Sequence, residues 1–216
     1  MSFTLVTPPK PVLDLADVKR HVRAEGFTDD DALLDALIEA ATSHIDGPEG
    51  WLGRCLGPQT WDWTIDAISD DGMSWSNTWA LNRSYVQIPV RPVISVDAIT
   101  YLDGDGVRQS WTDFVVFGLG STGPARIQPT LTGHWPSVIS QPEAVTVRFT
   151  AGYAKGDGET SEGTVEAVPY AIKAALKLIV GDLYQFRETV GDAKMASIPM
   201  SASVEALLNP YRIWET

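Results

Sequence analysis

The chain has little cysteine and little histidine, which limits the chemistry that it can carry. It has one cysteine, Cys55, so an internal disulfide and a cysteine-based zinc site are both excluded. The three histidines lie in different segments, and none is paired with another at the i, i+4 spacing of a helical metal site. No G-x-S-x-G motif is present, so nothing local marks a serine nucleophile. We therefore expect no cofactor, no metal and no catalytic site built from neighbouring residues.

The sequence also lacks a long apolar run and a basic cluster. No stretch approaches the roughly 18 uninterrupted apolar residues of a membrane-spanning helix, and residues 1–10 resemble no secretory signal. The formal net charge is −12, with 16 Lys and Arg against 28 Asp and Glu. Tight binding to nucleic acid depends on clustered cations that displace counterions from phosphates. We expect a globular cytoplasmic chain that associates neither with membranes nor tightly with DNA.

Helical periodicity is present at both ends of the chain. Near the N-terminus, Asp14 can cap a helix that ends at Gly26, and the residues 28–31 resemble a capping box in front of a second helix. Apolar residues then repeat on one face of that second helix until residues 47–48, which are Gly-Pro. Later in the chain, an apolar stripe over residues 168–186 predicts a long core helix.

Between these ends, alternating β-type runs are separated by turn residues. Five or six strands are expected, at residues 60–65, 85–90, 94–101, 111–117, 125–128 and 144–149. Short connections, such as the D-G-D-G turn at residues 103–106, indicate antiparallel pairing. The sequence therefore predicts an α+β fold, in which residues 1–57 and 160–216 form a discontinuous helical domain around an antiparallel β-rich insertion over residues 58–159.

Two motifs resemble ligand sites but lack parts that the ligands require. Residues 118–123 match G-x-G-x-x-G, yet Pro124 and a short strand follow in place of the helix that would face a pyrophosphate. Asp103 and Asp105 resemble the start of a calcium loop, but Val107 stands where the next oxygen ligand should be. We interpret both motifs as turns.

The chain has eight tryptophans, and most of them fall in or beside the β-rich part. Packing in a core or between subunits is the commoner use of such rings, and stacking on a sugar is the alternative. Trp75 and Trp79 lie in a polar loop, where a core does not explain them. We take these two residues as candidates for a protein contact made by the insertion.

An acidic stripe runs along the second predicted helix. Asp31, Asp35 and Glu39 follow one another at i, i+4, and each like-charged pair costs roughly a few tenths of a kcal/mol. The stripe is either a solvated helix face, or a surface that lines a channel or meets a basic partner.

The chain ends in an apolar, aromatic tail. A short amphipathic helix is expected up to Asn209 and Pro210, which break it. Chain ends are normally polar and frayed unless something ties them down, so this tail needs a surface, either its own core or another subunit. The candidate docking residues are Leu207, Leu208, Tyr211, Ile213 and Trp214.

Taken in order, several segments resemble head-tail connector (adaptor) proteins of tailed phages and gene transfer agents. The resemblance covers nearly the whole chain. No single motif is diagnostic of the family, but the order of the motifs is. The two most specific are F-T-A-G-Y at residues 149–153 and V-E-A-L-L-N-P-Y-R at residues 204–212. The others lie at residues 5–9, 15–23, 29–41, 168–173 and 184–188.

The resemblance implies a structural role without chemistry. Such proteins form a homo-oligomeric ring, commonly dodecameric, beneath the portal protein, and they offer a platform to the next tail component, the stopper. DNA passes through the ring without specific binding. The resemblance places the protein at the head-tail interface of the virion, and in the host cytoplasm during assembly. It also implies that the tail docks on the portal or on a neighbouring subunit, and that Asp31, Asp35 and Glu39 face the lumen.

Two other functions stay open on the residues alone. A carbohydrate-binding or glycoside-cleaving module could use the Trp-rich insertion, and it would need exposed tryptophan beside paired carboxylates. A small intracellular enzyme with nonlocal catalytic residues would need a concave pocket with perturbed acids or a histidine. Neither alternative explains the C-terminal tail.

Overall fold

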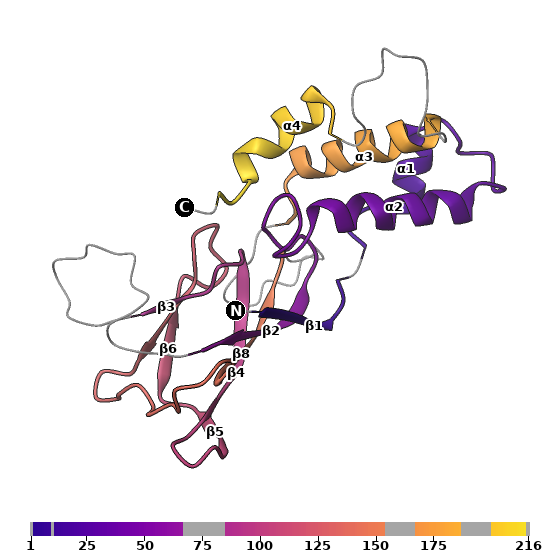
Figure 1. The fold of residues 1–216 in the computed structure, drawn as a ribbon. Helices are drawn as coiled ribbons and strands as arrows, with labels where there is room; N and C mark the ends of the chain where they lie inside the picture. Colours follow the sequence, from indigo (N-terminus) through magenta and orange to yellow (C-terminus); the bar gives the residue numbers. More distant parts are fainter. Residues whose placement is uncertain (1, 10, 67–84, 154–166, 187–199, 215–216) are drawn as a thin grey trace. The chain divides into compact units, whose positions relative to one another are not determined.

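The computed structural model describes residues 2–9, 11–66, 85–153, 167–186 and 200–214, which belong to two compact units (Figure 1). One unit consists of Met1–Pro9 and Pro58–Glu166, and the other consists of Lys10–Gly57 and Ala167–Thr216. The first unit is built from strands and the second from helices. The mixed α+β fold with antiparallel sheets and helices near the chain ends is therefore confirmed.

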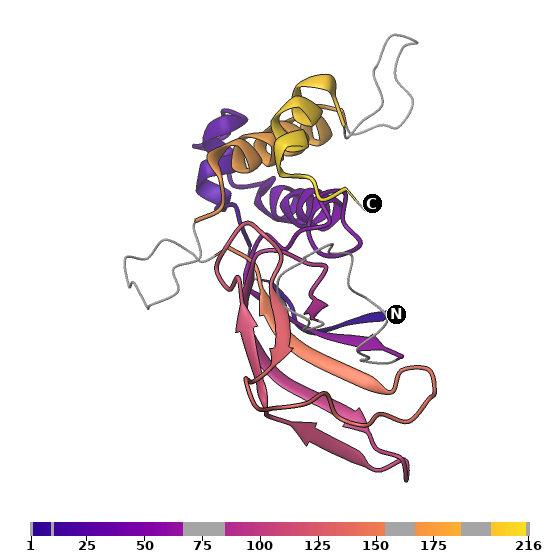
Figure 2. The ribbon, with the colours of Figure 1, turned by 90° about the vertical axis from the view of Figure 1, so that its left-hand side faces the viewer.

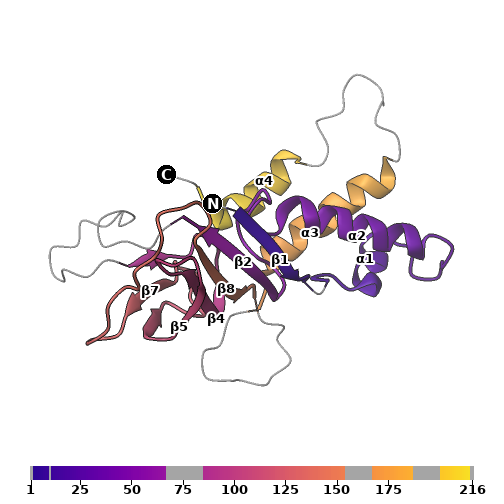
Figure 3. The same ribbon diagram turned by 60° about the horizontal axis from the view of Figure 1, so that its bottom comes forward.

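The helical unit is organised around its third helix. Its helices are α1 (Leu15–His21), α2 (Asp31–Ile45), α3 (Tyr170–Gln185), α4 (Ala202–Leu208) and the short 3-10 helix η1 (Asn209–Tyr211). Helix α3 contacts each of the three other α-helices, as Figure 3 shows for the neighbouring α2 and α4. Its buried residues are Ile172, Ala175, Leu176, Ile179 and Val180, which recur at helical spacing along the predicted apolar stripe.

The starts of the first two helices differ in how they are capped. The Asp14 side chain accepts a hydrogen bond from the backbone N–H of Ala16 at 3.3 Å, which confirms the predicted cap of α1. The capping box predicted at residues 28–31 is wrong, because the N-cap residue of α2 is Asp30 and its side chain makes no capping bond. The Asp30 carboxylate instead accepts a hydrogen bond from the Tyr184 hydroxyl of α3 at 2.6 Å.

The β unit contains two antiparallel sheets (Figure 2). The five-stranded sheet has the order β1-β2-β8-β4-β5, formed by Ser2–Thr7, Gln59–Ile65, Val145–Ala151, Val93–Leu102 and Arg108–Trp111. The three-stranded sheet has the order β3-β7-β6, formed by Val86–Gln87, Arg126–Pro129 and Phe114–Phe117. The single strand expected at residues 111–117 is thus divided into β5 and β6, one for each sheet.

Alternation along β2 and β8 separates a core face from a polar face. Trp63, Val147 and Phe149 are buried on one face. On the other face, Asp62 accepts two hydrogen bonds from the guanidinium of Arg148, each at 2.7 Å. This pairing raises the pKa of Arg148 above its ordinary value. The bidentate pair joins neighbouring strands on a surface that faces solvent, so it fixes register more than it adds stability.

The N-terminal residues belong to the β unit and not to the helical domain in which the sequence placed them. Strand β1 pairs with β2 from Ser2↔Thr64 onward. Phe3 stacks on Trp63 with ring centroids 6.3 Å apart and meets Trp61 edge-on at 6.2 Å. Aromatic pairs of this kind contribute about 0.5–1.5 kcal/mol beyond the area that they bury. This cross-strand packing explains the difference from the expected domain boundary.

The two ligand-like motifs are turns, as predicted. Residues 118–123 form the loop between β6 and β7, where Gly118 has φ 80° and an added Cβ would lie 2.8 Å from the Pro124 carbonyl oxygen. Asp103 lies in the β4–β5 hairpin, and its carboxylate accepts the backbone N–H of Val107 at 2.9 Å. A hydrogen bond from the Gln109 side chain, with smaller contributions from backbone N–H groups, lowers the pKa of Asp103.

Candidate docking surface at the C-terminus

The tail predicted to need a covering surface is tied to a loop of its own unit. After α4 and η1, the chain turns extended at Arg212. The backbone N–H of Ile213 donates to the carbonyl oxygen of Leu52 at 2.9 Å. The Nε–H of Arg54 donates to the Tyr211 carbonyl oxygen, also at 2.9 Å, and Arg54 is buried. The loop that follows α2 therefore holds the tail from both sides of Arg212.

Gly53, in the middle of this loop, lets the tail approach closely. It has φ 62°, and a Cβ built on it would lie 3.4 Å from the Cβ of Ile213. A side chain at this position would be strained by the backbone conformation, and it would lie in ordinary van der Waals contact with the tail. The loop beside Ile213 thus favours glycine for its backbone conformation, and no local pattern in the sequence marks this residue.

The candidate docking residues divide into buried and presented ones. Leu208 is fully buried in the helical unit, and Leu207, Tyr211 and Ile213 are partly exposed. Trp214 is 63% exposed. A side chain without solvent access cannot dock on another protein unless the unit opens, so we remove Leu208 from the candidate docking set. The tail packs partly on its own unit and presents its last described aromatic ring outward.

The guanidinium of Arg212 lies over two indole rings. The guanidinium carbon is 4.3 Å from the centroid of Trp51 and 4.3 Å from the centroid of Trp214. A cation over an indole face at an exposed site gains about 0.5–1 kcal/mol. The two contacts connect the loop after α2 to the end of the tail. Within the described residues, Arg212 makes no ion pair.

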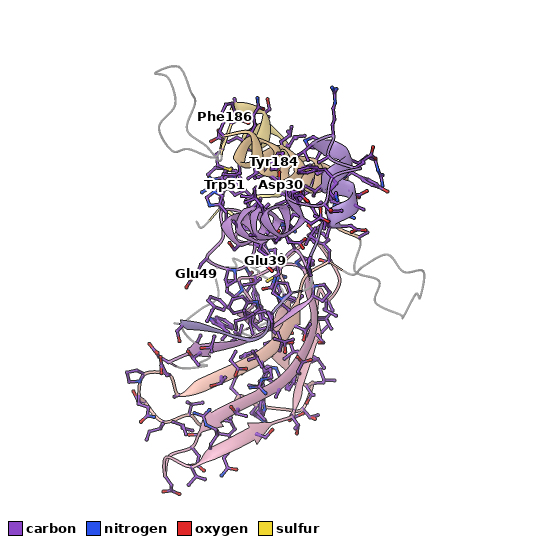
Figure 4. All side chains as sticks on the ribbon, turned by 90° about the vertical axis from the view of Figure 1, so that its right-hand side faces the viewer. Asp30, Glu39, Glu49, Trp51, Tyr184 and Phe186 are labelled. Atoms are coloured by element: carbon purple, nitrogen blue, oxygen red, sulfur yellow. The ribbon has the colours of Figure 1, made fainter. Side chains whose placement is uncertain are left out.

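The predicted acidic stripe is not uniform. Asp31 forms an ion pair with the nearly buried Lys19 of α1 at 2.6 Å. Asp35 and Glu39 are exposed and make no ion pair with another described residue. Figure 4 shows Glu39 on the side of α2 away from Tyr184. Asp31 therefore joins helices, and only the other two acids form a free surface.

The described tryptophans of the β unit pack on other aromatic rings. Trp111 lies 5.0 Å from Trp135 and 5.4 Å from Phe114, centroid to centroid, and Phe3 covers Trp61 and Trp63. Packing is therefore the use that the structure gives these rings. Trp75 and Trp79, the insertion contact candidates, lie outside the described residues.

The described residues contain neither a metal cluster nor a helix suited to a bilayer. No group of three or more His, Cys, Asp and Glu side chains among them is arranged to hold a metal ion. Within the same ranges, every helix is too short or too polar to cross a membrane.

Sequence reasoning missed the loop residues that hold the tail. Trp51 and Arg54 follow the Gly-Pro that ends α2, and neither lies in a periodic element. Their spacing from the tail, 157 residues in the case of Arg54 and Tyr211, leaves no local signal of the contact. A buried arginine and a tryptophan in one short loop are the sign that could have pointed to it.

No family model matches the chain, and no curated protein matches it. Three solved structures of gene transfer agent (GTA) particles contain a chain of the same fold. They are the neck of an empty particle computed with C6 symmetry (22% identity, TM-score 0.69), the virion of a native particle (22%, 0.69) and the neck of a native particle computed with C12 symmetry (21%, 0.67). Each match covers 100% of this chain and 97% of the other. The fold of this protein, over its full length, is therefore that of a chain found in the necks of such particles.

Proposed function

We propose that this protein is a structural virion protein, a head-tail adaptor that forms a ring beneath the portal, joins capsid to tail and continues the DNA channel. The observation that carries the proposal is the full-length likeness in fold to chains from GTA necks, with both units included. The order of sequence motifs supports the same assignment. The role needs no enzymatic activity.

The ring is the part of the proposal that the symmetry of the similar particles supports. Their necks were computed with C6 and C12 symmetry. A ring of identical subunits requires a heterologous contact, in which two different surfaces of one chain meet in neighbouring copies. The dodecamer implied by the sequence resemblance is compatible with either symmetry, because twelve copies can obey both. The ring would bind the portal on one side and the stopper on the other.

The tail supplies a docking surface for the portal or a neighbouring subunit. Trp214 is largely exposed although tryptophan is costly to leave in water. Tyr211 and Ile213 are partly exposed beside it, and Leu207 is partly exposed on α4. Aromatic anchors of this kind carry much of the binding energy of protein interfaces.

The acidic balance of the chain suits a channel through which DNA slides. A lumen with few cations does not hold phosphates, so DNA passes without specific binding. Of the three acids assigned to the lumen, Asp35 and Glu39 are the ones that the proposal retains as exposed carboxylates, while Asp31 already pairs with Lys19.

The assembly state in the presence of the portal tests this function. The chain is mixed with portal rings purified from the same particle, and native mass spectrometry measures the stoichiometry of the complex. We expect a ring of adaptor subunits bound to each portal ring. A chain that stays monomeric and never enters a complex with the portal would overturn the proposal. Assembly templated by the portal remains compatible with a chain that is monomeric alone.

A further inference from the structure

We infer that Arg212, which lies over the rings of Trp51 and Trp214, is a preformed docking point for a carboxylate of the portal protein. The inference rests on the proposed function and adds the chemistry of the partner surface. Nothing in the sequence resemblance or in the comparisons assigns a role to this cluster, which we call the Arg212 clamp.

Two indole rings lie next to the guanidinium of the clamp. The ring centroids of Trp51 and Trp214 are each 4.3 Å from its central carbon. The five N–H donors of an arginine all lie in the plane of the group. Only a ligand that approaches edge-on, in that plane, can accept from them. A planar carboxylate does so with two parallel hydrogen bonds.

Several cations of the helical unit have acceptors of their own: Lys19 pairs with Asp31, Lys177 lies 3.5 Å from Asp17, and Arg54 donates to a backbone carbonyl. Arg212 pairs with none of the described carboxylates, although Glu49 lies on the same side of the unit as Trp51 (Figure 4). A cation that makes no ion pair within the described ranges, on a chain with a net charge of −12, is complementary to an acidic partner.

The surroundings favour a protein carboxylate over a nucleic-acid phosphate. Phosphate binding by DNA-binding proteins draws on several clustered cations, whereas the clamp has one and the chain is acidic. Arginine and tryptophan are, in contrast, the residue types most enriched among the energetically dominant residues of protein interfaces. The partly exposed indoles would also shield the charge pair from water once the partner covers them.

The clamp is also fixed before any partner arrives. The Ile213 N–H to Leu52 bond and the Arg54 to Tyr211 bond hold the backbone on both sides of Arg212. Ordering side chains and loops on binding opposes association, so a surface that is already ordered binds more tightly. The backbone bonds beside Arg212 therefore lower the ordering cost of binding at the clamp.

Binding to portal rings from the same particle tests the inference by co-sedimentation across a salt series. The variants are Arg212→Gln, Arg212→Lys and the control Lys173→Gln, which removes one positive charge from α3 of the same unit. We expect Arg212→Gln to weaken binding at least about tenfold, Arg212→Lys to restore only part of the affinity because lysine lacks the planar donors, and Lys173→Gln to bind like the wild type. Raising the salt concentration should weaken the wild type more than Arg212→Gln. Thermal melting identifies any variant that has lost its fold, and the salt dependence of the wild type is then the deciding measurement.

The outcomes separate this inference from the proposed function. A wild-type chain that never binds the portal would overturn both. If the wild type binds, but Arg212→Gln binds equally well and salt affects the two alike, the adaptor function stands and the carboxylate contact is wrong. If the wild type binds duplex DNA and Arg212→Gln does not, the ligand is a phosphate and the inference is again wrong.

Discussion

Ile213 donates its backbone N–H to the carbonyl oxygen of Leu52 at 2.9 Å, and the tail is thereby held to the loop that follows α2. The bond links the two sequence segments of the helical unit, Lys10–Gly57 and Ala167–Thr216, which are separated in the sequence by most of the β unit. It makes the tail part of a folded surface, so Trp214 is presented in a defined place. The first two predictions separate this anchoring from docking.

Trp214→Ala should weaken docking on the portal while leaving the fold nearly unchanged. The ring is 63% exposed, so its loss should lower the free energy of unfolding by less than about 1 kcal/mol. A buried anchor at an interface contributes on the order of 2 kcal/mol to binding. Leu208→Ala is the control, because this fully buried residue should cost about 2–5 kcal/mol of stability. Thermal melting and co-sedimentation with portal rings measure the two effects. A large loss of stability in Trp214→Ala with docking retained would show that the Trp214 side chain stabilises its own unit and does not bind the portal.

Gly53→Ala should loosen the tail. The alanine would have to adopt φ near 62°, or the loop beside Ile213 would have to shift, at a cost of about 1–2 kcal/mol in unfolding free energy. Hydrogen exchange should become faster at the Ile213 amide. Gly104→Ala is the matched control, since nothing lies within 4 Å of a Cβ at that hairpin position. Equal exchange rates at Ile213 in both variants would mean that the loop does not fix the tail.

The acidic residues of α2 should have different roles, since one stabilises the fold and the other two are exposed. Asp31→Asn leaves the nearly buried Lys19 without its carboxylate partner, so unfolding free energy should fall by about 1–3 kcal/mol. The double variant Asp35→Lys, Glu39→Lys should keep its stability, because both side chains are exposed. In particles, that double variant should slow DNA passage or the completion of packaging. Unchanged packaging in the double variant would leave Asp35 and Glu39 as a solvated helix face.

The protein should bind duplex DNA weakly and without sequence preference at physiological salt. A chain with a net charge of −12 offers few cations to neutralise phosphates. Fluorescence anisotropy with labelled duplexes of different sequence, over a range of salt concentrations, measures this. Sub-micromolar binding that persists as salt is raised would contradict a lumen past which DNA slides.

The helical parts of this fold follow from local patterns in the sequence. The stripe of α3 and the cap at Asp14 depend on residues close together in the chain, and both were predictable. Strand β1 was not predictable, because its stability comes from Phe3 packing on Trp61 and Trp63 of a strand more than fifty residues away. The capping box failed for a related reason, since Asp30 hydrogen-bonds to Tyr184 of another helix.

The candidate site shows the same division between local and nonlocal information. The apolar tail was visible in the sequence because a cluster of exposed aromatic residues at a chain end is unusual. Its anchoring by Leu52 and Arg54, and the stacking of Arg212 on Trp51, depend on contacts between distant segments. Periodicity and spacing carry no information on such contacts.

Electron cryo-microscopy of the purified particle tests the central claim most directly. If the protein is a head-tail adaptor, density that fits its two units will form a closed ring of repeated copies directly beneath the portal, with Trp214 against the portal or a neighbouring subunit and DNA or an open channel on the ring axis. Density for the chain elsewhere in the particle, or a neck ring built from other proteins with this chain absent, would contradict the claim.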